Sequence, residues 1–355
     1  MEENNFILKK EGFYKSFVVL VLGCGKIEKK SSGKRKSDIS RPDPIILTQK
    51  GSKGHMGKNN IQENIRKLAE YQGIDVIGFA DASKFKDYLL KNSKRRDPKL
   101  SLSDAKTIIV VGVYIGGLVL SSWTKSNFGR TSRLFLSGFF NDVIKQIEPI
   151  SALLKNEGYT ALICDDSKSG GSIIPLKLAA IRAGIGWQGK HSLLISRQYG
   201  TFLALGGIIT NANLDHNDKE ERNLCKNCKK CQEACPLKAL GNDYILNKDR
   251  CLSYILQNDN MPEEAKTVSE NRIIDCEICQ QVCPWNAKHI NQPLNTRMTL
   301  TFQKKIAAWE DFFTLTKLVK LTEHDYRKTL GYLNAGIPYS IFYRNILMAM
   351  EHIQN

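Results

Sequence analysis

Apolar and polar segments alternate along most of the chain in patterns that predict helices and strands in turn. From residue 61, apolar side chains recur at helical spacing up to Gln72, and Gly73 follows where a helix commonly ends. The β-branched run 108–114 is typical of a strand. We expect helices at 61–72, 84–91, 139–157 and 174–183, strands at 74–80, 108–114 and 160–164, a strand or strand pair over 199–209, and mostly helical chain from Glu310. This alternation indicates an α/β fold.

One uncharged stretch, Thr107–Thr124, approaches the ~18 residues of a membrane-spanning helix. Gly112, Gly116 and Gly117 interrupt it, and its first half is β-branched. A run of this kind favours a strand that is buried on both faces of a sheet. We therefore expect a buried parallel strand followed by a loop, with a spanning helix as the alternative.

The composition is that of a folded protein with a strong positive charge. The chain has 355 residues, of which 42% are hydrophobic and 25% charged, which excludes global disorder, collagen-like sequence and a small disulfide scaffold. The 52 Lys and Arg outnumber the 36 Asp and Glu, giving a net charge of +16. Such a balance suits a polyanionic partner, either nucleic acid or an anionic membrane, although a basic enzyme without such a partner fits equally well.

The first 58 residues differ from the remainder. They contain 13 basic and 6 acidic residues, and Gly, Ser, Lys and Arg dominate from Gly25 to Lys58. This composition predicts a disordered basic extension over residues 1–58, with Met56 as an alternative start. The rest of the chain is also basic, with 39 basic against 30 acidic residues.

A short apolar run, Phe17–Gly23, precedes Cys24 and resembles a lipoprotein cleavage site. The run has only seven residues, acidic residues dilute the positive charge before it, and no twin-arginine pair precedes it. We expect a cytoplasmic protein with no membrane association. Lipid anchoring through Cys24 is the alternative.

Eight of the ten cysteines lie between Cys225 and Cys283, in spacings that are typical of iron–sulfur proteins. The first run, C-x2-C-x2-C-x3-C-P from Cys225 to Pro236, is the bacterial ferredoxin spacing. The second, C-x2-C-x3-C-P, ends at Pro284 and lacks one cysteine, which Cys251 can supply. Zinc also accepts C-x-x-C pairs, but the repeated spacing favours two [4Fe–4S] clusters.

The spacing also predicts which thiolates share a cluster. In two-cluster proteins, the fourth cysteine of such a run ligates the other cluster. One cluster is accordingly expected on Cys225, Cys228, Cys231 and Cys283, and the other on Cys235, Cys251, Cys276 and Cys279.

The second half of the chain resembles the epoxyqueuosine reductase family. The resemblance extends from about Ile61 to Asn345 and is densest from Ala179 to Asn286. Its matching segments are Ala183–Leu193, Asp249–Tyr254, Met261–Glu264, Asn271–Arg272, Cys276–Asn286 and Arg344–Asn345.

This resemblance implies a fold, cofactors and a reaction. The expected fold is a nitroreductase-like α/β cobalamin-binding domain, followed by a ferredoxin-like double-cluster domain and a short helical C-terminus. We place these parts at residues 59–215, 216–295 and 296–355. The clusters would reduce cobalamin from Co(II) to Co(I), and the epoxide of epoxyqueuosine in tRNA would be removed with loss of water. tRNA and an external electron donor of the ferredoxin or flavodoxin type are the expected partners.

The resemblance also suggests residues of the site. Those implied to contact the cobalamin are Gly184, Gly186, Gly189, Lys190 and His191, although the glycines are equally compatible with helix–strand packing. The family carries a catalytic acid 14 residues before Gly184, where this chain has Gly170. Asp165 and Asp166 could fill that role if the following loop contains an insertion.

Two observations keep other activities open. Residues 141–155 lack the family's usual Tyr-His entry, and the segment from Leu193 to Gly200 is similar to reductive dehalogenases, in which a tyrosine donates a proton. Tyr199 is the corresponding candidate here. A reductive dehalogenase-like enzyme, a corrinoid-protein reductase and a plain electron-transfer ferredoxin are therefore the alternative functions.

Overall fold

The computed structural model describes residues 58–83, 85, 97–164, 174–216, 221–291, 309–330 and 337–354. All of them belong to one compact unit, Gly54–Asn355. Cys24 and almost all of the predicted extension lie outside the described residues, as does nearly all of the helix expected at 84–91.

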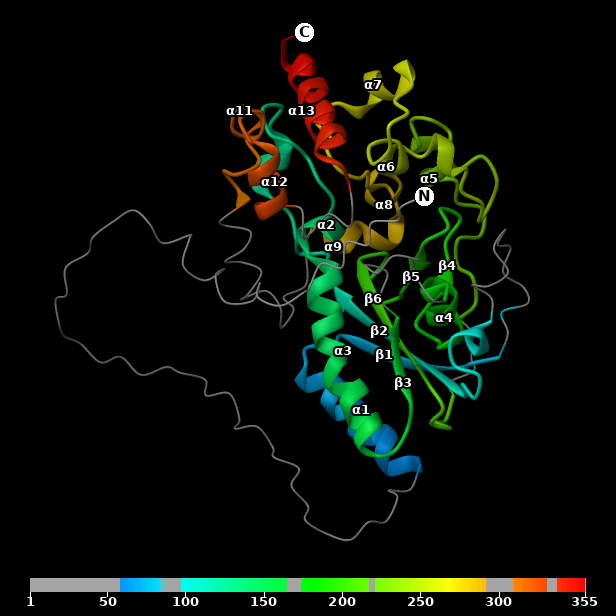
Figure 1. Ribbon diagram of the computed structural model, residues 1–355. Coiled ribbons are helices and arrows are strands. Elements are labelled where there is room, and N and C mark those ends of the chain that lie inside the picture. Colours follow the sequence, from blue (N-terminus) through cyan, green and yellow to red (C-terminus); the bar gives the residue numbers. More distant parts are fainter. Residues whose placement is uncertain are drawn as a thin grey trace, which may run out of the picture. The chain divides into compact units, whose positions relative to one another are not determined.

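The first part of this unit contains a sheet and the helices that cover it (Figure 1). Its elements are α1 (Lys58–Tyr71), β1 (Val76–Asp81), β2 (Thr107–Tyr114), α2 (Arg133–Leu136), α3 (Phe139–Asn156), β3 (Ala161–Cys164), α4 (Leu176–Arg182), β4 (Trp187–Gln188), β5 (Leu194–Ile195) and β6 (Leu203–Thr210), with short 3₁₀ helices at Pro98–Leu100 and Ser121–Thr124. The predicted helices at 61–72, 139–157 and 174–183 and the three predicted strands are confirmed within a few residues.

The four long strands form one sheet in the order β1-β2-β6-β3, and each neighbouring pair is antiparallel. The central strands β2 and β6 pair along their whole length, from Thr107 opposite Thr210 to Tyr114 opposite Leu203. The prediction of a parallel strand at 108–114 is therefore wrong. All eight residues of β2 are buried, and a continuous apolar run reports burial on both faces without reporting strand direction.

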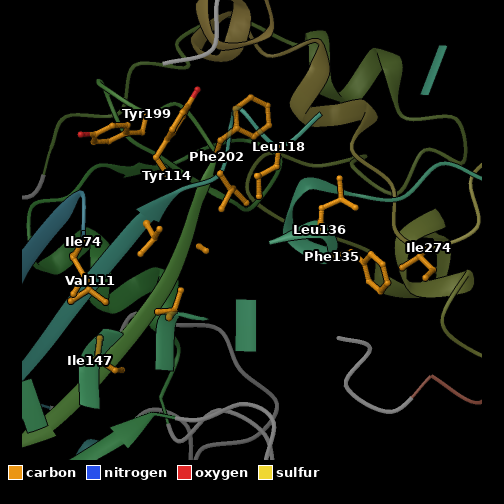
Figure 2. Close-up of a cluster of buried hydrophobic side chains, with 14 of the residues drawn as sticks. Ile74, Val111, Tyr114, Leu118, Phe135, Leu136, Ile147, Tyr199, Phe202 and Ile274 are labelled. Atoms are coloured by element: carbon orange, nitrogen blue, oxygen red, sulfur yellow. The ribbon is translucent and has the colours of Figure 1, made fainter. Parts of the chain in front are cut away.

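Helices pack on both faces of this sheet. Side chains of β2 alternate between two cores: Ile109 and Val111 face the core that includes Ile65 of α1 and Ile147 of α3, as Figure 2 shows for Val111 and Ile147. Ile108 and Val110 of β2 face the second core, which α4 covers. None of the helices in the described residues is both long and apolar enough to cross a bilayer.

The remaining elements are short helices and one long C-terminal helix. They are α5 (Lys230–Ala234), α6 (Leu252–Ile255), α7 (Glu263–Ser269), α8 (Ile278–Gln281), α9 (Ala287–Asn291), α11 (Leu315–Leu318), α12 (Glu323–Thr329) and α13 (Tyr339–Gln354), with 3₁₀ helices at Lys248–Arg250 and Pro284–Asn286. The C-terminal helices share the larger core of the sheet through Leu318, Phe342 and Ile346, and Phe313, just before α11, joins the same core. The domain borders at 215 and 295 remain predictions.

Candidate functional site

The glycine-rich segment from Gly184 to Gly189, called the glycine turn, leads from the end of α4 through β4 into the β4–β5 hairpin. Gly184 follows α4 with φ +71°, the left-handed conformation that favours glycine after a helix. A Cβ on Gly186 would lie 2.0 Å from the carbonyl oxygen of Ile195, and a Cβ on Gly189 would lie 2.4 Å from Cε1 of His191. Backbone conformation explains Gly184, and close packing within the protein explains Gly186 and Gly189. These observations agree with the alternative that the glycines serve helix–strand packing.

Lys190 is buried at the end of this turn. Its ammonium Nζ lies 3.1 Å from Oδ2 of Asp243, and this carboxylate raises the pKa of Lys190. The carbonyl of Lys190 also accepts a hydrogen bond from the backbone N–H of Tyr244. The loop before Cys251 is thus fixed to the glycine turn, a pairing that the sequence did not indicate because more than fifty residues separate its partners.

His191 is almost fully buried beside Lys190. Burial, with a further contribution from the charge of Lys177, lowers the pKa of His191 to about 4, so the imidazole is neutral at physiological pH. Nδ1 accepts a hydrogen bond of 3.2 Å from the backbone N–H of Leu193, which leaves the proton of the neutral ring on Nε2. Within the described residues, this Nε2 is buried without a hydrogen-bond partner. The side chain can therefore offer one N–H donor to a bound group.

The depressed pKa of His191 predicts a loss of stability in acid. Between pH 6.5 and about 4 the unfolded chain binds a proton at this residue that the folded chain does not. The free energy of unfolding should fall through this window as the pH is lowered, by up to about 3 kcal/mol. The His191→Gln variant should lose less stability than the wild type between pH 7 and pH 4 in urea titrations. Equal losses in the two proteins would contradict the prediction.

Tyr199 lies at the end of the sheet, in a turn closed by the pairing of Ser196 with Gly200. Its ring centroid is 5.5 Å from that of Tyr114, the last residue of β2, and both side chains are seen in Figure 2. Burial and the nearby charge of Asp75 raise the pKa of Tyr199, so its phenol keeps its proton at neutral pH. The tyrosine can therefore act as a proton donor.

The same sheet end contains a histidine that the sequence reasoning missed. The hydroxyl oxygen of Tyr114 lies 2.9 Å from Nδ1 of the buried His289, on α9. His289 comes only six residues after Cys283, so its place beside the cysteine motif was the one available signal. By contrast, Asp165 and Asp166 lie outside the described residues, which stop at Cys164 and resume at Ile174.

The eight clustered cysteines are free thiols that fall into two neighbouring groups. Burial raises the pKa of Cys283 to about 11, and the thiols that interact with it electrostatically are Cys225, Cys231 and Cys228. Burial likewise raises the pKa of Cys276 to about 11, and its interacting thiols are Cys251 and Cys235. The thiol of Cys279 interacts with that second group and also with Cys231, so the two groups adjoin.

Each group has its own surroundings. Cys225 and Cys283 pack with Trp187 and Ile195 of the β4–β5 hairpin, so the first group borders the glycine turn. Cys276 packs with the separate core of Leu252, Ile255 and Leu256. Among the described residues, no three or more His, Cys, Asp or Glu side chains are close enough together to hold a single metal ion.

Comparisons with known proteins agree with this arrangement. Residues 224–286 match the family model of the 4Fe-4S double cluster binding domain. An epoxyqueuosine reductase from Lactococcus garvieae is 34% identical over 265 residues, which cover 67% of this chain and 73% of the relative. The chain belongs to the epoxyqueuosine reductase family. It is accordingly an oxidoreductase, and the predicted resemblance and the double-cluster region are confirmed.

Solved structures of the family show the same fold. The epoxyqueuosine reductase from Streptococcus thermophilus superimposes with a TM-score of 0.67 at 27% identity, covering 83% of this chain and 82% of the other. An epoxyqueuosine reductase crystallised with an epoxyqueuosine-modified tRNA-Tyr stem loop gives a TM-score of 0.70 at 22% identity, covering 84% and 83% of the two chains.

Proposed function

We propose that this protein reduces epoxyqueuosine in tRNA to queuosine. The reaction consumes two electrons and two protons, and the epoxide oxygen leaves as water. The observation that carries the proposal is the 34% identity to an epoxyqueuosine reductase over 73% of that enzyme's length. The double-cluster region supports it, because its first group of thiols packs against the glycine turn, where the second cofactor is expected.

The proposed cluster ligands are the two groups expected from the spacing. The cluster beside the glycine turn would be held by Cys225, Cys228, Cys231 and Cys283. The cluster beside the core of Leu252, Ile255 and Leu256 would be held by Cys235, Cys251, Cys276 and Cys279. The electrostatic pairing of Cys283 with the first group and of Cys276 with the second supports this crossed assignment. Electrons would enter at the second cluster and leave from the first. The external donor would be a one-electron carrier of the ferredoxin or flavodoxin type.

Cobalamin is the proposed second cofactor, held by the nitroreductase-like α/β part next to the ferredoxin-like region. The buried N–H of His191, which has no partner among the described residues, fits a contact with a bound cofactor. Because that nitrogen carries the proton, His191 would donate a hydrogen bond rather than ligate cobalt. The ammonium of Lys190 is already bound to Asp243, so Lys190 would contribute mainly by fixing the loop of Asp243 to the glycine turn. Cobalamin, once reduced, supplies the low-potential electrons that the epoxide requires.

The candidate donors of the proton to the departing epoxide oxygen are Tyr199, Asp165 and Asp166. Tyr199 keeps its proton at neutral pH and lies at the end of the sheet. Asp165 and Asp166 directly follow Cys164, which shares a core with Ala179 and Ala183 of the segment that leads into the glycine turn. A carboxylic acid entering the site from this position could protonate the departing oxygen.

Replacing these carboxylates tests the acid. We expect Asp165→Asn or Asp166→Asn to retain both clusters and cobalamin but to lower turnover by about 10²-fold or more. Tyr199→Phe is the comparison, because it removes the other candidate donor and keeps the ring. Single-turnover assays with a modified tRNA stem loop would measure the three variants. Full activity in both Asp variants, with activity lost only in Tyr199→Phe, would contradict the carboxylate assignment and favour a dehalogenase-like donor.

The function itself is tested by expressing the gene in cells that lack their own epoxyqueuosine reductase. Mass spectrometry of tRNA nucleosides should then detect queuosine in place of its epoxide. The net charge of +16 agrees with a phosphate-rich substrate. Persistent epoxide in the presence of cluster-loaded protein would contradict the proposal and favour a corrinoid-protein reductase or dehalogenase-like activity.

A further inference from the structure

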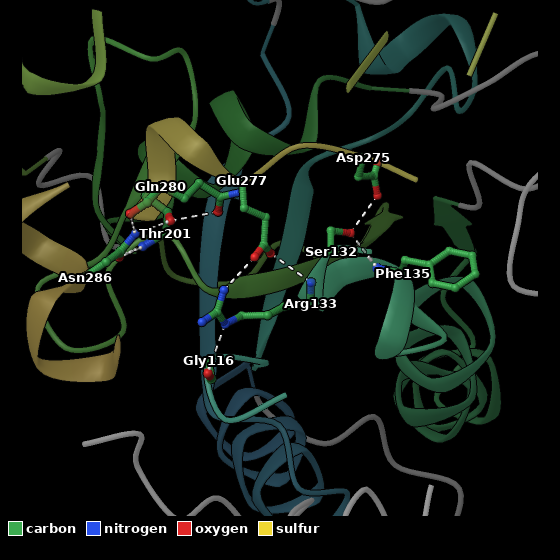
Figure 3. A network of polar contacts seen from close by, with 9 residues as sticks. All are labelled: Gly116, Ser132, Arg133, Phe135, Thr201, Asp275, Glu277, Gln280 and Asn286. Carbon is green, nitrogen blue, oxygen red and sulfur yellow. Dashed lines mark hydrogen bonds and ion pairs between the residues drawn. The ribbon is translucent and has the colours of Figure 1, made fainter. Parts of the chain in front are cut away.

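Two consecutive residues at the start of α2 hold the two acids that flank Cys276 (Figure 3). The hydroxyl of Ser132 donates a hydrogen bond of 2.6 Å to Oδ2 of Asp275. Arg133 binds Glu277 twice: its backbone N–H donates to Oε1 at 2.8 Å and its Nη1 to Oε2 at 2.5 Å. The loop that carries Cys276 is therefore held on both sides by a single turn of the α/β part.

The Arg133–Glu277 pair is buried on both sides, with 5% and 4% of the two side chains exposed. Burying two charges costs about as much free energy as their attraction returns, so the pair contributes little net stability. Breaking it by removing one partner leaves an uncompensated charge in the interior. A pair of this kind is better suited to fixing the electrostatics of its surroundings than to stabilising the fold.

The other contacts of Arg133 connect this loop to the end of the sheet. Nε donates to the carbonyl of Gly116 at 3.1 Å, just beyond Tyr114, and the guanidinium lies 4.4 Å from the ring centroid of Phe202. A second polar contact runs in parallel, from Thr201 to Gln280 and Asn286, as Figure 3 shows. Arg133 thus connects Glu277 to the segments that also carry Tyr114 and Tyr199.

We propose that Arg133 and Glu277 act in opposite directions on the reduction potential of the cluster assigned to Cys235, Cys251, Cys276 and Cys279, so that their two effects cancel. This proposal rests on that assignment, but not on the identity of the substrate. Reduction adds one electron from an external reductant to the cluster and makes it more negative. A net positive charge nearby therefore raises the potential, and a net negative charge lowers it. Arg133 and Glu277 carry opposite charges beside two of the ligands, so each offsets the effect of the other on the potential. Both are positioning residues rather than catalytic ones.

Removing one charge at a time separates this role from a purely structural one. The Glu277→Gln variant leaves the guanidinium unpaired and should raise the midpoint potential of one cluster. The double variant Arg133→Gln with Glu277→Gln is neutral again and should return that potential close to the wild-type value. Glu323→Gln, which removes the acid of the exposed Arg327–Glu323 pair on α12, is the matched control and should change neither cluster.

The measurement is a redox titration of the full chain followed by paramagnetic resonance, with iron content determined in parallel. It needs no turnover, so failure of the proposed function would leave it interpretable. An unchanged potential in Glu277→Gln with both clusters present would overturn the proposal, as would an equal shift in the single and double variants. If Glu277→Gln loses iron, Glu277→Ala is titrated with reductant in its place, because it removes the same charge without leaving a buried amide. Its potential should also rise, and a fall or no change would overturn the proposal.

Discussion

Replacing Cys225 and Cys283 together by alanine is expected to remove one cluster and leave the other, with about four irons per chain instead of about eight. The two thiols are 58 positions apart in the sequence, yet they interact electrostatically and pack with the same hairpin residues, Trp187 and Ile195. Removing two of four ligands leaves too few thiolates to hold a cluster. The second group, around Cys276, keeps all of its ligands and its separate apolar surroundings.

A second pair of alanine substitutions makes this prediction specific. Cys225 and Cys235 belong to one continuous motif, but the crossed assignment places them in different clusters. Their joint replacement therefore leaves each cluster with three of its four thiolates, and we expect both clusters to lose iron. Ligation by consecutive cysteines predicts the reverse: the Cys225–Cys235 variant would keep one intact cluster, with about four irons, and the Cys225–Cys283 variant would keep none intact. Iron analysis and visible absorption of anaerobically purified protein would distinguish the two assignments.

The cysteine pattern was informative because cluster ligation is largely a local property. Three thiolates on a tight loop are encoded by spacing alone, and the matched region, 224–286, contains every cysteine that we assigned. The burial of β2 was equally accessible, because a strand covered on both faces must be apolar throughout. Its antiparallel direction was not accessible, because pairing with β6 is decided by residues about a hundred positions away.

The residues that connect the parts of the site were missed for a related reason. Asp243, which pairs with Lys190, and Glu277, which pairs with Arg133, are ordinary acidic residues in the sequence. Nothing in their local pattern distinguishes them from solvated surface charges. Their role arises only because the fold places each one against a buried cation more than fifty positions away. Such pairs require the tertiary structure, whereas the cluster ligands do not.

Gly186→Ala is expected to destabilise the chain by about 3 kcal/mol, at the upper end of the usual cost of overpacking. The new Cβ would lie 2.0 Å from the carbonyl oxygen of Ile195, and backbone cannot move aside as a flexible side chain can. Ile195 also packs with Trp187 and Cys283, so displacing it should lower the iron content of the neighbouring cluster as well.

Gly241→Ala is the matched control, because Gly241 is exposed and a Cβ there would meet nothing within 4 Å. Its free energy of unfolding in urea should stay within about 0.5 kcal/mol of the wild type. Similar stabilities of the two variants would show that this position tolerates a side chain, and the close approach of its backbone to Ile195 could then not be the reason for Gly186.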